Sequence, residues 1–122
     1  MKQNDEIFVL IGAAMEVHNT LGPGLPEKCY QDAFAVELGI QNIPFEREKH
    51  LPVAYKGVTL PHDFFADFVC YGNIIVELKA TTENESVFRS QVITYLKASG
   101  YSNGVLLNFG QKSLYYDRVF NF

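Results

Sequence analysis

The sequence predicts a mixed α/β (α+β) fold in which a central mixed β-sheet is flanked by helices. Apolar residues recur at helical spacing in two segments before residue 40 and again at 85–99. Between them, residues 45–80 show the alternation of strands, and the apolar run at 104–110 is too short for a helix. The order helix, helix, three strands, helix, strand is typical of a sheet covered by helices.

Two helices are expected at the start of the chain. Residues 5–20 form the first, and the LGPG sequence at 21–24 ends it, because glycine permits the left-handed geometry of a helix end and proline cannot continue the hydrogen-bond ladder. Pro26 suits the first turn of the second helix, which we expect to run to about Leu38 and to end at Gly39.

The strands and the third helix follow. Strands are predicted at about 45–55, 58–70 and 74–80. Helical spacing at 85–99 ends at Gly100, and this helix can act as a crossover to the strand at 104–110. The sequence SLYYDRVF that comes next can add an edge strand.

Length and composition limit the class of protein. With 122 residues, the chain is expected to be one domain, 1–122, that buries about two-thirds of its unfolded surface. Its net charge of −4 argues against a passive nucleic-acid coat, because nonspecific binding depends on Lys and Arg that neutralise phosphates. No stretch of about 18 uncharged apolar residues occurs, so we expect a cytoplasmic protein with no membrane partner.

The third predicted strand carries two charged residues on one face. Side chains alternate along a strand, so Ile74, Val76, Leu78 and Ala80 share one face and Glu77 and Lys79 share the other. Burial of the apolar set therefore places the charged pair together.

Whether Asp67 joins this pair depends on the hairpin register. A two-residue turn would place Asp67 opposite Leu78 on the apolar face, whereas a three-residue turn at 71–73 would place it opposite Glu77. We favour the second register, because glycine suits the left-handed position of a three-residue loop and the first register would bury a carboxylate in the core.

Opposed carboxylates require compensation. Like charges facing each other destabilise a sheet, and a divalent cation such as Mg²⁺, which is held by one or two carboxylates together with water and phosphate, would remove the repulsion. Lys79 could then stabilise charge on a reacting phosphate or orient a water molecule. The alternative is a surface Glu77–Lys79 pair on a solvated strand face, with Asp67 merely near a turn.

These residues carry a family resemblance. The segment ADFVCYGNIIVELKA resembles the central motif of the PD-(D/E)XK nuclease superfamily, in which an Asp precedes a hairpin and an acid-x-Lys triplet follows it. Together with EVHNTLGPGLPEKCYQDAF, QVITYLKASG and GVLLNFG, it is similar to the small bacterial family of GxxExxY proteins, whose name matches Gly24, Glu27 and Tyr30. The resemblance covers about residues 11–110.

The resemblance implies a restriction-endonuclease-like core with the active site along one edge of the central strands. Asp67 and Glu77 then correspond to ligands of Mg²⁺ or Mn²⁺, and Lys79 corresponds to the catalytic lysine. Ala66 stands where the motif has proline, a departure that leaves the carboxylate in place.

Further site candidates lie on the helices. Gln91 and Tyr95 match a Q-x-x-x-Y element of exonuclease-like branches, and their spacing of four places both on one helix face, with helix packing as the alternative role for Tyr95. Glu27 is the first choice for a third carboxylate that binds metal, although its charge also suits the helix dipole. Glu16 is the second choice, and for it we prefer a solvated helix face.

Two functional hypotheses follow. The first is a metal-dependent phosphodiesterase that acts on DNA or RNA. The second is a non-catalytic binding or assembly module that retains the nuclease fold. A homodimer is plausible under both, because so small a domain offers little area to grip a duplex.

Overall fold

The computed structural model describes residues 3–83 and 85–121, which form three helices and five strands. In chain order the elements are α1 (Gln3–Leu21), α2 (Glu27–Ile40), β1 (Phe45–Tyr55), β2 (Val58–Cys70), β3 (Ile74–Lys79), α3 (Ser86–Ser99), β4 (Asn103–Asn108) and β5 (Tyr115–Phe120). None of the helices that the structure describes has the length and apolar character needed to cross a membrane.

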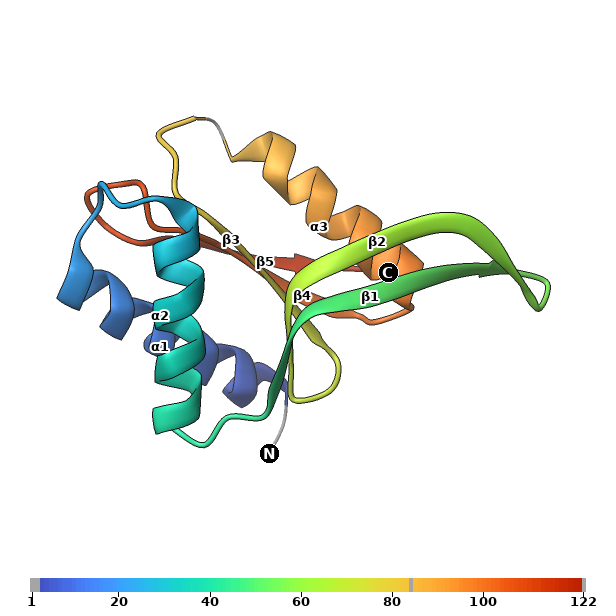
Figure 1. The fold of residues 1–122 in the computed structure, drawn as a ribbon, viewed down its shortest axis with the longest axis horizontal. Helices are drawn as coiled ribbons and strands as arrows, with labels where there is room; N and C mark the ends of the chain where they lie inside the picture. The colour runs from blue at the N-terminus through green and yellow to red at the C-terminus, as the bar shows by residue number, and fades with distance from the viewer. Residues whose placement is uncertain (1–2, 84, 122) are drawn as a thin grey trace.

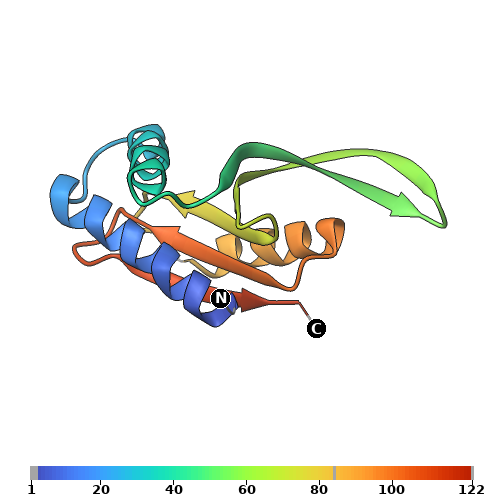
Figure 2. The ribbon, with the colours of Figure 1, turned by 90° about the horizontal axis from the view of Figure 1, so that it is seen from below.

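The strands form one sheet in the order β1-β2-β3-β4-β5. Strands β3 and β4 are parallel, with α3 as their crossover, and the other neighbours are antiparallel. Helices α1 and α2 cover one side of the sheet and α3 covers the other, as Figures 1 and 2 show. This five-stranded mixed sheet with flanking helices confirms the predicted fold class.

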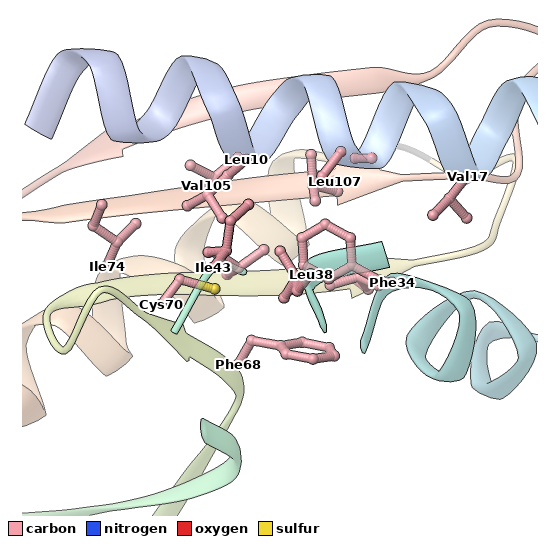
Figure 3. Close-up of a cluster of buried hydrophobic side chains, with 14 of the residues drawn as sticks. Leu10, Val17, Phe34, Leu38, Ile43, Phe68, Cys70, Ile74, Val105 and Leu107 are labelled. Carbon is pink, nitrogen blue, oxygen red and sulfur yellow. The ribbon is translucent and has the colours of Figure 1, made fainter. Parts of the chain in front are cut away.

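The main core lies between the sheet and the first two helices (Figure 3). Phe34 from α2 and Phe68 from β2 are fully buried and meet edge to face, with ring centroids 5.1 Å apart. Such an aromatic pair contributes about 0.5–1.5 kcal/mol beyond the burial of its area. Leu10 of α1 and Leu107 of β4 belong to the same cluster, so the core joins both helices to the central strands.

A second, smaller core lies under α3, where Val92 and Leu96 pack against Ile75 and Leu106. Strand β3 is therefore buried on both faces, because the parallel pair β3–β4 is covered by helices on each side. The expectation of a single apolar face on β3 was too simple. The alternative of a solvated Glu77 is wrong, since Glu77 is 2% exposed.

The end of α2 also differs from the expectation. Gly39 lies inside the helix, and the chain reverses at Asn42, whose φ is 57°. The Ile43 N–H donates to the Leu38 carbonyl (2.9 Å) and the Asn42 N–H to the Gly39 carbonyl (3.1 Å), which together form a Schellman motif. Ile43 and Leu38 are buried in one cluster, so this apolar contact fixes the helix end beyond the glycine.

Strands β1 and β2 form a long hairpin whose distal part projects from the body of the protein (Figures 1 and 2). Strand β2 pairs with β3 through Phe68, Val69 and Cys70. Asp67 is the next residue, so it stands where β2 leaves the central sheet.

Candidate functional site

The β2–β3 hairpin has the three-residue turn that the sequence favoured. Cys70 pairs with Ile74 and Phe68 pairs with Val76, which confirms the register. Tyr71 and Gly72 both have left-handed backbones, with φ of 54° and 79°. Continued by one residue, the same register places Asp67 opposite Glu77.

The side chains of Asp67 and Glu77 each accept a hydrogen bond from the backbone of the neighbouring strand. The Asp67 N–H donates to Glu77 Oε1 (2.7 Å), and the Leu78 N–H donates to Asp67 Oδ2 (2.9 Å). Where β2 and β3 separate, these side-chain hydrogen bonds therefore replace backbone hydrogen bonds as the link between the two strands. These bonds engage Glu77 Oε1 and Asp67 Oδ2, and the two side chains also form a hydrogen bond with each other.

Burial makes this pair difficult to ionise. Desolvation, followed by the charge of the neighbouring Asp67, raises the pKa of Glu77 to about 9. Desolvation also raises the pKa of Asp67, although its bond from the Leu78 N–H acts in the opposite direction. The pair therefore retains a proton near neutral pH, and a bound cation would favour its release because the cation stabilises the charged form.

Lys79 places a positive charge beside these acids. Its charge lowers the pKa of Asp67, of Glu77 and of Glu27. The Lys79 Nζ lies 4.9 Å from the centroid of the Phe88 ring on α3, a cation–π distance. Its backbone is fixed by the parallel strand, because the Phe109 N–H donates to the Lys79 carbonyl (2.8 Å).

Glu27, the first residue of α2, is half-buried near the same charges. Desolvation raises its pKa, Lys79 lowers it and Asp67 raises it. Gln31 donates a hydrogen bond to its carboxylate (3.1 Å). No group of three or more His, Cys, Asp and Glu among the described residues is arranged to hold a metal ion, so Glu27 stands apart from the pair in this conformation. Glu16 is exposed on α1, as preferred from the sequence.

Gln91 and Tyr95 lie on the side of α3 that faces the site. The Gln91 side-chain amide donates to the Tyr95 hydroxyl oxygen (2.9 Å). The pKa of Tyr95 is raised first by burial and then by the charge of Glu77. Tyr95 also packs against Phe64 of β2, with ring centroids 6.0 Å apart. Its position therefore combines packing with proximity to the carboxylates.

Comparison with known protein families shows which superfamily the chain belongs to. Residues 4–119 match the family described as the PD-(D/E)XK nuclease superfamily. The chain belongs to this superfamily. Nucleases of the PD-(D/E)XK superfamily generally use divalent metal ions, and membership implies an interaction with nucleic acid.

Comparison with solved structures agrees on the fold. The crystal structure of a protein named SSO0001 matches with a TM-score of 0.50 and 15% sequence identity, and the match covers 98% of this chain and 79% of that chain. At this identity the likeness shows the fold alone. No curated protein matches the sequence.

The donor atoms suit the divalent ions that PD-(D/E)XK nucleases generally use. Mg²⁺ prefers oxygen ligands and takes one or two carboxylates, with water and phosphate oxygens completing its shell. Asp67 and Glu77 offer two adjacent carboxyl groups that are held by backbone donors, and loss of the proton they retain would free their oxygens for the ion. The residues therefore fit such an ion.

Two neighbours of this PD-(D/E)XK site went unrecognised in the sequence. Glu48 of β1 has a left-handed backbone (φ 47°) between residues that pair with Phe68 and Ala66, and its charge raises the pKa of Asp67. Phe88 lies under Lys79. Neither has a local signal, because each becomes a neighbour only through the pairing of β1 with β2 or the packing of α3.

Proposed function

We propose that this chain is a Mg²⁺- or Mn²⁺-dependent nuclease of the GxxExxY type that hydrolyses phosphodiester bonds in DNA or RNA. It would act in the bacterial cytoplasm as a single domain, 1–122. The observation that carries the proposal is the pair Asp67 and Glu77, each locked by a backbone N–H of the opposite strand, with the charge of Lys79 beside them.

In this proposal the carboxyl groups of Asp67 and Glu77 would hold the metal ion. A divalent ion in such a site supplies a nucleophilic water near neutral pH and neutralises charge on the phosphate. Glu27 is the proposed third carboxylate, and the influence of the Lys79 and Asp67 charges on its pKa supports this choice. A change of its side-chain rotamer would be needed to bring it to the pair.

Lys79 and the α3 residues complete the proposed mechanism. Lys79 stabilises negative charge on the reacting phosphate, because a preorganised cation in a partly buried site acts more strongly than it would in water. The Gln91–Tyr95 pair orients the attacking water or the substrate backbone, with Tyr95 held by Phe64. Binding of the ion would favour release of the Glu77 proton to solvent, because the cation stabilises the charged form.

The decisive experiment is metal-stimulated cleavage of a panel of single- and double-stranded DNA and RNA. Lys79→Ala and Asp67→Asn are expected to lose activity by about 10²–10³-fold, the usual effect of removing one preorganised electrostatic group. Lys97→Ala removes an exposed lysine from α3 and is expected to retain activity. Equal rates in the wild type and all three variants would identify the activity as a contaminant.

A non-catalytic module with the nuclease fold is the second candidate. The net charge of −4 favours it, because binding of nucleic acid over a wide surface requires basic residues. Calorimetric titration with Mn²⁺ separates the two, since such a module shows no binding that Asp67→Asn abolishes. A homodimer is proposed in either case, and sedimentation that shows only monomer would remove it.

A further inference from the structure

A polar groove of about 350 Å³ lies where the chain leaves β3, directly after Lys79. One wall is the α1–α2 loop and the other is the segment that follows β3, which meet at the same end of the sheet (Figure 1). The lining residues are Gly24, Leu25, Ala80, Thr81, Thr82 and Gly110. Ala80 directly follows Lys79 at the end of β3, and Leu25 stands two residues before Glu27, whose pKa is affected by the charges of Lys79 and Asp67, so both walls continue along the chain from residues of the proposed site.

The first wall is held by a buried tyrosine. The Tyr30 hydroxyl donates to the Gly22 carbonyl (2.5 Å) and accepts from the Leu25 N–H (3.2 Å), so it spans the loop. Its ring is 0% exposed and stacks on Phe109, with centroids 4.8 Å apart and planes 12° apart. The core therefore fixes the shape of this loop.

The second wall is held by Asn108, which lies beside Lys79 in the parallel pair. The side-chain oxygen of Asn108 accepts from the N–H groups of Thr81 (3.1 Å) and Gly110 (3.0 Å). Its amide nitrogen donates to the Thr81 carbonyl (2.9 Å) and to the Glu85 carboxylate (2.7 Å). A Cβ on Gly110 would lie 2.2 Å from the Thr81 nitrogen, so only glycine permits this approach.

The chemistry of the groove indicates its occupant. Among the residues that the structure describes, no charged side chain lines the groove, and its surface consists of backbone, Leu25, small side chains and two threonine hydroxyls. A phosphate would find no cation there, whereas an uncharged polar group would find hydrogen-bonding partners. The volume is within the range of pockets that bind small molecules, and both walls are preformed, which lowers the entropy cost of binding.

We propose that this groove is a nucleoside subsite, which holds the sugar and base of the nucleotide next to the phosphate that is cleaved. The inference rests on the proposed function, because it takes Lys79 and the carboxylates as the place of that phosphate. Tyr30 and Asn108 are positioning residues in this arrangement. They shape the walls and do not touch the reacting atoms.

Filling the groove tests the inference. Thr82 is an exposed lining residue, so Thr82→Trp should block the groove without disturbing the core. Thr94→Trp, at an exposed threonine of α3 away from the groove lining, is the matched control. The probes are fluorescein-labelled single strands of DNA and of RNA, each of about 12 nucleotides, in Ca²⁺, with the dissociation constant measured by anisotropy.

Thr82→Trp is expected to weaken binding about tenfold, an effect in the range of one lost base contact, and Thr94→Trp is expected to bind like the wild type. Unchanged binding by Thr82→Trp, or no binding of either probe by the wild type, overturns the subsite. Cleavage separates the two proposals. A wild type that cleaves, with Lys79→Ala inactive and Thr82→Trp unaffected, refutes the subsite alone. A wild type that binds through the groove but never cleaves refutes the nuclease alone.

Discussion

Replacing Glu77 by Gln is expected to remove most of the pH dependence of stability in the metal-free protein. Gln has nearly the shape of a protonated Glu, and its side-chain carbonyl can still accept the Asp67 N–H. Since Glu77 is 2% exposed, the wild type must ionise a buried group at high pH and the variant need not.

The magnitude follows from the raised pKa. The pKa of Glu77 is about 9 in the folded protein, against an ordinary value of 4.5 that applies when the chain is unfolded. Between these two pKa values the folded state holds a proton that the unfolded state releases. The stabilisation that the neutral Glu77 side chain gives to the folded state is therefore complete below pH 4.5 and is lost as the pH rises through 9. Each pH unit in that window lowers the unfolding free energy by about 1.4 kcal/mol, which amounts to about 6 kcal/mol in all.

The assay is urea unfolding followed by circular dichroism at several pH values between 5 and 9, with a chelator present. As the pH rises, the unfolding free energy of Glu77→Gln minus that of the wild type should increase steadily. Glu83→Gln, at an exposed acid, should follow the wild-type curve. If the curves of wild type and Glu77→Gln run parallel, Glu77 is already ionised at neutral pH and the electrostatic account of the site is wrong.

Substitutions at three further positions, Tyr30, Phe34 and Asn42, test the fold around the site. Tyr30→Phe leaves the Gly22 carbonyl and the Leu25 N–H without their partner, so urea unfolding should show a loss of about 1–3 kcal/mol; a loss below about 0.5 kcal/mol would show that the loop does not depend on the hydroxyl. Phe34→Ala empties a fully buried position against Phe68 and should cost about 3–5 kcal/mol in the same assay, whereas Val36→Ala on the exposed side of α2 should cost little. Asn42→Gly should match or exceed the wild-type melting temperature, and Asn42→Ala should lower it, because the backbone there has φ of 57°; equal effects of Gly and Ala would contradict the left-handed helix end.

The register of the central hairpin was predictable because one local feature decides it. Tyr71, Gly72 and Asn73 form the turn, and the penalty for burying Asp67 against Leu78 excludes the other register. The pairing of Asp67 with Glu77 follows from this register together with side-chain alternation, so the position of the acid pair could be derived without tertiary information.

Other features could not be derived, because they depend on contacts between distant segments. The end of α2 passes Gly39 since Ile43 packs on Leu38, and this apolar contact outweighs the local preference of glycine for a helix end. The burial of Glu77 depends on α3 covering the second face of β3, which a strand pattern of six residues does not reveal. In the sequence, Tyr30 could be identified only as the tyrosine of the GxxExxY pattern. The structure shows that its hydroxyl group holds the α1–α2 loop through two hydrogen bonds.

The position of the acid pair explains how a folded protein tolerates it. Inside a complete ladder, the backbone N–H groups of Asp67 and Leu78 would bond to carbonyl oxygens and could not serve the carboxyl groups. Because β2 pairs with β3 only as far as Phe68, and Glu48 of β1 does not pair with Asp67, these N–H groups bond to the side chains instead. The separation of the strands thus provides the donors that hold the acids and the opening through which an ion and a phosphate could reach them. A substitution that extended the β2–β3 ladder past Asp67 would gain backbone hydrogen bonds and lose the site.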